Sequence, residues 1–307
     1  MLSTLSRRIL RTTTLQLSFK RCRSGTSTGR LMQEDPLEHF YYDKVIVSGV
    51  PSSFVKNSLR VHEPDEPISL VKARYQHANY AWKVKQLVQD IVYTPEDENY
   101  PDSVFVEDPA VVFDGTALLT KIGHPSRIGE PQNIRGVLES LDLHIVELSK
   151  LSPTATMDGG DVLFTGKEFL IGLSRRTNKE AIEAFAQVFR DYPVTAITIQ
   201  SEVLHLKSMS SMAGVGVIAI GDTPAGRQAW DEIERKAHYK YDRLSFPDEN
   251  AANCLFINGT IFHVPQEEYP NSYHVWENYN RYPKVELPNS EFSKADGSLT
   301  CTSIRIN

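Results

Sequence analysis

The chain has 307 residues, of which 40% are hydrophobic and 23% charged, so it has an ordinary globular composition and room for one large domain or two. Its cysteines, Cys22, Cys254 and Cys301, are three in number and far apart, which excludes a disulfide framework and a paired-cysteine metal clip and is typical of a reducing compartment. No apolar run reaches the length of a membrane span.

Positive charge is concentrated at the N-terminus. Residues 1–31 contain seven basic residues and no acid: Arg7, Arg8, Arg11, Lys20, Arg21, Arg23 and Arg30. Together with its Ser, Thr and Leu content, this segment predicts a mitochondrial targeting sequence; a basic arm for nucleic acid or a membrane surface is the alternative, as is a cytoplasmic location. Without these seven, 26 of the 33 Lys and Arg remain against 39 Asp and Glu, a net charge of −13. An acidic body argues against a nucleic-acid partner and suits a cationic small molecule.

The first half of the chain reads as short strands around longer helices. The predicted elements are a strand at 44–48, a loop at 52–70, a helix at 70–91, an acidic loop at 94–101, strands at 104–106, 110–113 and 117–119, a helix at 134–141 and a strand at 144–146. Asp114-Gly115 is the turn of a hairpin.

The second half repeats this order. It predicts strands at 161–164 and 169–171, a helix opened by a capping box at 177–180, strands at 194–199, 203–204 and 217–220, a helix from Thr223-Pro224, strands at 241–246, 254–257 and 261–264, a helix at 267–281 and a last strand at 299–306. We expect the last strand to pair with the first near Val45, so that both ends of the chain share one unit.

Recurrence of strand–turn–strand–helix–strand units at about 50 residues predicts radial repetition around an axis. The fold class is α/β: five units in a propeller-like ring with helices outside, forming a single domain over residues 40–307. An ordinary two-layer α+β domain is the competing interpretation.

Cys301 is the first candidate for chemistry. It lies in the closing segment 297–307, between small hydroxyl residues and after the turn Asp296-Gly297. A thiolate held on a fixed element with small neighbours could serve as a nucleophile. The alternative is a buried structural cysteine.

Other polar residues stand at predicted strand ends. His205 follows an extended apolar stretch, in competition with His124 and His263. Three acids, Asp102, Glu107 and Asp108, bracket an apolar run. Asp158 and Asp161 flank a glycine pair that permits close backbone approach, although simple turns explain both pairs of acids equally well. The sequence supports a metal site less well, because no histidine or cysteine stands at ligand spacing beside these acids.

Two arginines occupy equivalent places in successive units. Arg127 and Arg176 each lie between a strand and the following helix. Together they could bind one carboxylate, which suits the guanidinium fork; the alternative is simple solvation.

Five motifs in register resemble those of the dimethylarginine dimethylaminohydrolase family. They are Asp102-Ser-Val-Phe-Val-Glu-Asp108, Met157-Asp-Gly-Gly-Asp-Val-Leu-Phe-Thr-Gly166, Gly172-Leu-Ser-Arg-Arg-Thr177, Leu204-His-Leu-Lys-Ser208 and Leu299-Thr-Cys-Thr-Ser303. The resemblance runs from about Lys44 to the end of the chain. It implies the five-bladed αβ propeller (pentein) fold of the amidinotransferase superfamily, in agreement with the repeat count.

The resemblance also implies an activity, the hydrolysis of Nω-methylated arginines to citrulline and methylamine or dimethylamine. It assigns Cys301 as nucleophile, His205 as general acid and base, and Asp158 as the carboxylate that orients the histidine. The implied substrate contacts are Leu59 in a mobile lid, Asp102, Glu107 and Asp108 around the guanidinium and amino-acid ends, Arg127 and Arg176 on the α-carboxylate, and Ala295. No metal or organic cofactor is implied.

The sequence departs from the family's pattern at two places, and both concern substrate selectivity more than the reaction itself. Ala295 is smaller than the residue expected there, and the lid around Leu59 carries extra prolines. The partner we expect is a small-molecule substrate, with no nucleic acid and no membrane; monomer and homodimer both stay open.

Four alternatives are considered for the function. An arginine deiminase or an amidinotransferase would use the same residues on the same fold. A non-catalytic arginine-analogue binding protein could lose Cys301 or His205, and a papain-like hydrolase would need its cysteine near the mature N-terminus.

Overall fold

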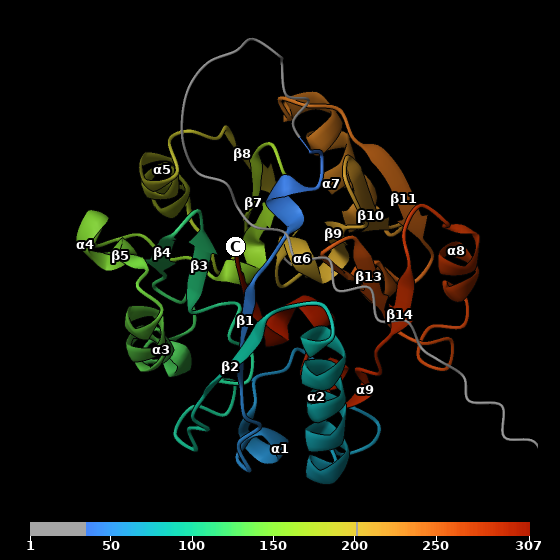
Figure 1. Ribbon diagram of the computed structural model, residues 1–307, viewed down its shortest axis with the longest axis horizontal. Helices are drawn as coiled ribbons and strands as arrows, with labels where there is room; N and C mark the ends of the chain where they lie inside the picture. Colours follow the sequence, from blue (N-terminus) through green and yellow to red (C-terminus); the bar gives the residue numbers. More distant parts are fainter. Residues whose placement is uncertain (1–34, 201) are drawn as a thin grey trace, which may run out of the picture. The chain divides into compact units, whose positions relative to one another are not determined.

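A computed structural model describes residues 35–200 and 202–307. The predicted targeting segment, residues 1–31, lies outside the described residues. Within residues 35–307 the strands form five three-stranded sheets, as the repeat pattern predicted (Figure 1). No helix of this described part combines the length and apolar character needed to cross a bilayer.

Four sheets share one plan, in which two strands form an antiparallel hairpin and a third joins the middle strand in parallel. The strands, in chain order, are β3 (Ala110–Phe113), β4 (Thr116–Leu119) and β5 (His144–Glu147); β6 (Val162–Phe164), β7 (Phe169–Leu173) and β8 (Val194–Thr198); β9 (Ser210–Met212), β10 (Val217–Gly221) and β11 (Asp242–Phe246); and β12 (Leu255–Ile257), β13 (Thr260–His263) and β14 (Lys284–Glu286).

The fifth sheet is made from both ends of the described chain. Strand β1 (Lys44–Ser48) pairs in parallel with β2 (Asp90–Thr94) and antiparallel with β15 (Ile304–Ile306), where Val45 faces Arg305. The prediction that the two ends share one unit is therefore confirmed, and the final strand closes the set of five sheets.

Turn chemistry fixes the register of two hairpins. Asp114 and Gly115 have φ values of 44° and 71°, and Asn258 and Gly259 have 49° and 76°. Two successive residues with positive φ match the twist of a two-residue hairpin, which Asp-Gly and Asn-Gly adopt at the least steric cost.

The longer helices lie outside the sheets (Figure 1). They are α2 (Leu70–Lys85), α3 (Glu130–Ser140), α5 (Lys179–Val188), α7 (Pro224–Lys236) and α8 (Tyr273–Asn278), with short turns at α1 (Phe54–Asn57), α4 (Leu148–Leu151), α6 (Leu206–Met209) and α9 (Ser290–Ser293). Single-turn 3-10 helices lie at Glu38–Phe40, Pro125–Arg127, Gly159–Asp161, Glu249–Ala252 and Leu299–Thr302.

Helix caps follow the sequence signals with one correction. Thr223 caps α7 by accepting a hydrogen bond from the Gly226 N–H, with Pro224 in the first turn, as predicted. The cap of α5 is Asn178, which accepts from the Ala181 N–H, and not the predicted Thr177. Thr177 instead donates its backbone N–H to Ser174.

Several predicted elements are wrong. No strand forms at 203–204, and the first strand of that sheet is β9 at Ser210–Met212. Residues 104–106 form turns, with the Phe105 N–H bonded to the Asp102 carbonyl at 2.9 Å; their apolar side chains are buried in core and mimicked a strand. The helix predicted at 70–91 ends at Lys85, because Ile91 pairs with Val45 in the sheet. The helix predicted at 267–281 is limited to α8, since Pro270 disfavours continuation on its N-terminal side.

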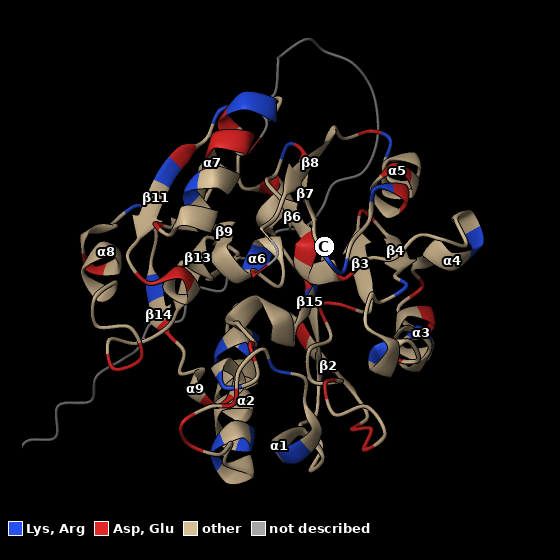
Figure 2. Ribbon diagram, turned by 180° about the vertical axis from the view of Figure 1, so that it is seen from behind, with Lys and Arg blue, Asp and Glu red and all other residues tan. Residues whose placement is uncertain are grey.

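The five inner strands, β3, β6, β9, β12 and β15, surround a central channel. Contacts join β15 to β3, β6 to β9 and β9 to β12. Of these strands only β15 contains a charged residue, Arg305, whereas charges are frequent on outer helices such as α7 (Figure 2). Uncharged side chains from the inner strands therefore form most of the channel wall, and Glu107, Lys207 and Thr300 enter it from turns and short helices.

Candidate active site

One cavity at the end of the channel brings together eight of the ten predicted site residues. These are Leu59, Asp102, Asp108, Arg127, Arg176, His205, Ala295 and Cys301. The other lining residues are Phe105, Leu204, Asp296 and Gly297. Residues separated by more than 200 positions thus converge on one point, and the cysteine and the histidine share one cavity.

Cys301 lies in a single 3-10 turn, Leu299–Thr302, directly before β15. The prediction of a continuous strand here is wrong, because the turn is closed by the Ser298 carbonyl, which accepts the Cys301 N–H at 3.2 Å. Sγ of Cys301 in turn accepts the Ser298 N–H at 3.3 Å. The turn presents the sulfur toward the cavity, while β15 anchors it to the sheet.

The surroundings of Cys301 disfavour its thiolate when the cavity holds no cation. Burial, followed by the negative charges of Glu107 and Asp108, raises the pKa of the Cys301 thiol to about 12. The Ser298 N–H and the Lys207 ammonium act in the opposite direction. In the ligand-free protein the thiol is therefore protonated at neutral pH.

His205 is the N-cap of the short helix α6, and not the end of a strand as predicted. Its Nε2 lies 2.9 Å from Oδ2 of Asp158. Burial lowers the pKa of His205, but the carboxylates of Asp108, Asp158 and Asp161 outweigh burial and raise the pKa to about 9. The imidazole is thus a cation at neutral pH, ready to donate a proton.

Asp158 is fully buried and holds the imidazole from behind. Its Oδ1 accepts the Gly123 N–H at 2.8 Å, and its Oδ2 also lies 3.4 Å from Nη1 of Arg176. With both oxygens engaged, the carboxylate has a fixed orientation and fixes the histidine ring.

The glycine pair after Asp158 is required by close packing, as predicted. A Cβ on Gly160 would lie 2.7 Å from Nδ1 of His205 and 2.9 Å from Oδ1 of Asp108. A Cβ on Gly159 would lie 1.9 Å from the Glu107 carbonyl oxygen. Neither position has space for a side chain, so the Asp158 segment approaches the other two site segments through bare backbone.

Arg127 is deeply engaged with protein groups. It makes a two-pronged ion pair with Glu130, at 2.8 Å from both Nε and Nη2, and its Nη1 donates to Oδ2 of Asp108 at 2.7 Å. Burial raises the pKa of Asp108, but Arg127 and His205 outweigh it and lower the pKa to about 2. Asp108 is therefore an anion at neutral pH.

Arg176 keeps more of its guanidinium available to the cavity. Among the described residues its side chain pairs with Asp158 alone, and its backbone N–H donates to Ser174. The two arginines do line one cavity, as predicted, but they are not equivalent, because Arg127 already serves two carboxylates.

The loop that carries Leu59 is tied down at two points. The Leu59 N–H donates to Asp102 at 3.0 Å, and the Val61 N–H donates to Oδ2 of Asp296 at 2.5 Å. Burial raises the pKa of Asp102, with Arg127 acting in the opposite direction. Both acceptors, Asp102 and Asp296, also line the cavity. The loop is therefore hydrogen-bonded directly to the cavity wall.

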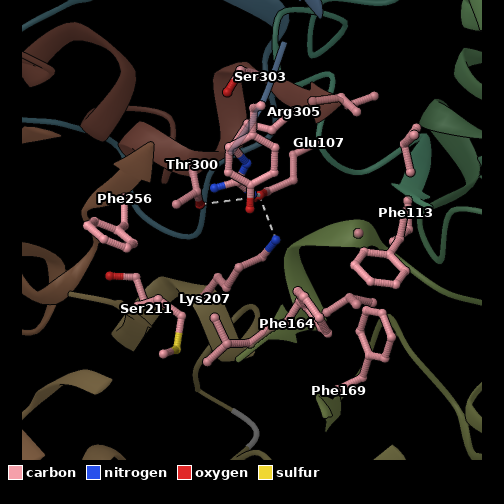
Figure 3. A pocket seen from close by; sticks show the side chains of 18 of the residues that line it. Glu107, Phe113, Phe164, Phe169, Lys207, Ser211, Phe256, Thr300, Ser303 and Arg305 are labelled. Atoms are coloured by element: carbon pink, nitrogen blue, oxygen red, sulfur yellow. Dashed lines mark hydrogen bonds and ion pairs between the residues drawn. The ribbon is translucent and has the colours of Figure 1, made fainter. Parts of the chain in front are cut away.

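Glu107 does not line this cavity. Its carboxylate faces the central channel, where it accepts from Nζ of Lys207 at 2.5 Å and from Oγ1 of Thr300 at 3.0 Å (Figure 3). Nη2 of Arg305 lies 3.3 Å away. Of the three acids that the resemblance places around the substrate, Asp102 and Asp108 line the cavity, whereas the turn after Val106 directs Glu107 to the channel.

The competing histidines lie elsewhere. The His124 ring bonds to the hydroxyl of its neighbour Ser126, and His263 stacks on Trp276 at a centroid distance of 5.1 Å. Neither lines the cavity that contains Cys301.

Three side chains at the site could in principle hold a metal ion. Asp108, Asp158 and His205 offer ligand atoms that all lie within 4.8 Å of one another, the one such group found in the described part of the chain. Their atoms are already bonded to Arg127, to backbone N–H groups and to each other. The atoms that could bind a metal ion therefore already have hydrogen-bond or ion-pair partners within the protein.

Sequence reasoning missed Asp296, Glu130 and Lys207. Asp296 was treated only as part of a turn, although its positive φ of 55° marks an unusual backbone position. Lys207 stands in the quoted histidine motif, two residues after His205, but nothing in one sequence links it to Glu107. Glu130 is three residues after Arg127, a spacing that signals a local ion pair.

Comparisons with known proteins agree with this geometry. The sequence model of the family described as "N,N dimethylarginine dimethylhydrolase, eukaryotic" matches residues 51–222. The bovine (Bos taurus) protein DDAH2 is 32% identical over 76% of this chain and 84% of its own length. The N(G),N(G)-dimethylarginine dimethylaminohydrolase of Pseudomonas aeruginosa is 27% identical over 86% of this chain and 99% of its own length.

Solved structures show the same fold. A cysteine-to-serine variant of the Pseudomonas aeruginosa enzyme DDAH, complexed with citrulline, superposes with a TM-score of 0.74 at 24% identity, over 87% of this chain and all of that one. The N-terminal domain of ArgZ superposes with a TM-score of 0.72 at 19% identity, over 86% of this chain and 97% of that one. Five sheets of one plan, one shared cavity and the match to the family's sequence model agree: the chain belongs to the dimethylarginine dimethylaminohydrolase family.

Proposed function

We propose that this protein hydrolyses Nω-methylated arginines, namely asymmetric dimethylarginine and monomethylarginine, to citrulline and dimethylamine or methylamine. The observation that carries the proposal is the cavity in which Cys301 and His205, which is held by Asp158, face three acidic side chains and two arginines. Family membership and the relatives named as dimethylarginine dimethylaminohydrolases support it.

Charge complementarity fits such a substrate. The carboxylates of Asp102 and Asp108 line the cavity and suit a guanidinium and an amino group, and Arg176, with Arg127 behind it, suits an α-carboxylate. Substrate would also touch the backbone at Leu59 and at Ala295. These contacts would hold the reacting carbon beside the sulfur. Such positioning of the two reacting atoms accelerates the attack.

Binding of the cation activates the nucleophile. The guanidinium opposes the charges of Glu107 and Asp108 that raise the pKa of Cys301, so the thiol loses its proton to solvent. The thiolate attacks the guanidinium carbon, and the His205 imidazolium protonates the departing nitrogen as the carbon–nitrogen bond breaks. The amine leaves, and a thiouronium adduct joins Cys301 to the rest of the substrate.

Hydrolysis regenerates the enzyme. Neutral His205 removes a proton from water, the hydroxide adds to the thiouronium carbon, and the carbon–sulfur bond breaks to give citrulline and the thiolate. Asp158 keeps the imidazole aligned in both steps because it holds Nε2 throughout.

Three substrates separate this reaction from those of its fold relatives. Purified protein should release citrulline from asymmetric dimethylarginine much faster than from arginine, and arginine with glycine should give no transfer product. Preferential turnover of arginine would indicate a deiminase, and transfer to glycine an amidinotransferase.

We also propose that residues 1–31 direct the protein to mitochondria. Their seven basic residues and their lack of acids support this. A fluorescent reporter fused to residues 1–35 should enter mitochondria, and a version with the seven basic residues changed to Gln should not. Cytosolic retention of the unchanged fusion would reject the proposal.

A further inference from the structure

The turn that carries Cys301 and the turn that carries His205 are joined by a ring of buried polar contacts behind the cavity. The carboxylate of Glu107 accepts from Lys207 through one oxygen and from Thr300 through the other. Lys207 follows His205 by two residues, and Thr300 directly precedes Cys301. Figure 3 shows Lys207 reaching across the channel to Glu107.

Asn253 closes the ring from the opposite side. Its amide nitrogen donates to the Lys207 carbonyl at 2.7 Å, and its amide oxygen accepts the Thr300 N–H at 3.1 Å. The Glu107 N–H also donates to the carbonyl of Cys301 itself at 3.1 Å. Both reactive turns are thus hydrogen-bonded to the same two side chains.

The members of this ring are buried. Lys207 is 6% exposed, Glu107 is 4% exposed and Asn253 is 1% exposed. A lysine buried to this degree needs a carboxylate partner. Without Lys207, the Glu107 carboxylate would keep Arg305 as its cationic partner, with Nη2 3.3 Å away, and less of the negative charge behind the sulfur would be offset.

We propose that Lys207 is a positioning residue for the nucleophile. By pairing with Glu107 across the channel, it holds the Cys301 turn in register with the His205 turn and neutralises the carboxylate behind the sulfur. The predicted effect of Lys207 on turnover rests on the proposed function. Its predicted effect on the reactivity of the Cys301 thiol does not. Glu107 then acts through Thr300 and the Cys301 backbone and does not contact the substrate.

Several charged groups face Cys301 besides this pair. They are Asp108 from the turn after Glu107, and Asp102, Arg127, Arg176, His205 and Asp296 from the cavity wall. Arg305 of β15 also pairs with Glu107, at 3.3 Å. Because all of these stay in place when Lys207 or Glu107 is changed, a difference between variants isolates the pair. Lys207 lowers the pKa of Cys301 and Glu107 raises it, so the two substitutions should act in opposite directions.

The test compares Lys207→Met, Glu107→Gln and the double variant. At pH 8, the rate of iodoacetamide alkylation, measured by mass spectrometry on the Cys301 peptide, should fall several-fold in Lys207→Met, because loss of the ammonium favours the protonated thiol. It should rise in Glu107→Gln and return toward the wild-type value in the double variant. Lys207→Arg, which keeps the charge, should recover most of the wild-type rate.

Turnover supplies the second readout. With asymmetric dimethylarginine, kcat of Lys207→Met should fall about tenfold while KM changes less than about twofold, because no substrate contact is removed. A matched control is Lys236→Met on α7, whose lysine pairs with Glu232 at 2.6 Å away from the cavity and should change neither readout.

A folded Lys207→Met protein with wild-type alkylation and kcat would overturn the proposal. If Lys207→Met does not fold, Glu107→Gln decides, and an unchanged alkylation rate in that variant overturns it. If the wild-type protein turns over no methylarginine, the proposed function fails, while the alkylation rates still decide the role of Lys207.

Discussion

Nε2 of His205 lies 2.9 Å from Oδ2 of the buried Asp158, and His205 lines the same cavity as Cys301. A second carboxylate, Asp108, is paired with Arg127 next to it. The histidine is therefore held as a cation between anions, and the cysteine is held as a neutral thiol. We expect the neutral thiol of Cys301 to become a thiolate only when a cationic ligand offsets the negative charges around it.

Cys301→Ser should abolish citrulline release while ligand binding persists. The hydroxyl is a far weaker nucleophile, but it leaves the binding carboxylates and arginines in place. Isothermal titration with citrulline and asymmetric dimethylarginine, together with a turnover assay, would measure both properties. Retained turnover would contradict the assignment of the nucleophile.

The two arginines should respond differently to truncation. Arg176→Ala should mainly raise KM, because it removes binding to a group remote from the reacting carbon. Arg127→Ala should instead lower the free energy of unfolding by about 3–5 kcal/mol, since it removes the guanidinium that pairs with the buried carboxylates of Asp108 and Glu130. Steady-state kinetics and urea denaturation separate the two effects; an unchanged KM in Arg176→Ala would count against the carboxylate clamp.

Gly160→Ala should reduce kcat by more than about tenfold. Its methyl group would meet His205 and Asp108 at less than 3.0 Å and push the imidazole from its position. Gly136→Ala in α3 is the matched control, because no atom lies within 4 Å of its Cβ. The control should keep full activity and gain up to about 1 kcal/mol of stability from better helix propensity. Equal activity of the two variants would refute the steric role of Gly160.

Stability should fall between about pH 6.5 and pH 9 through His205. The folded pKa of about 9 exceeds the ordinary value of 6.5, so protonation stabilises the fold fully below pH 6.5, and this contribution is lost as the pH rises through 9. The loss should be on the order of 3 kcal/mol, from about 1.4 kcal/mol for each pKa unit. Urea denaturation of wild type and His205→Gln across this range measures it. The same slope in both proteins would show that another group titrates.

Local signals were sufficient for two of the hairpins, for the start of α7 and for the closure of the ring. Asp114-Gly115 and Asn258-Gly259 specify their turns by backbone preference alone, and Val45 and Ile304 have the β-branched character of paired strands. Apolar runs without periodicity were less informative. Residues 104–106 are apolar because they are buried, and not because they are extended.

Part of the site could likewise be predicted from the sequence, and part could not. Cys301, His205 and Asp158 were assigned through motifs that resemble those of the family, and the fold brings Cys301 and His205 to one cavity. The side to which Glu107 points depends on a turn that one sequence does not specify, and its partner Lys207 is 100 residues away. Long-range pairs of this kind are visible only in the folded chain.

The most direct test of the covalent mechanism is mass spectrometry of the Cys301 peptide after rapid acid quenching of enzyme with asymmetric dimethylarginine. A thiouronium adduct on Cys301 should accumulate during turnover, and it should be absent from Cys301→Ser. Steady citrulline release with a Cys301 peptide that stays unmodified at every quench time would contradict attack by this sulfur.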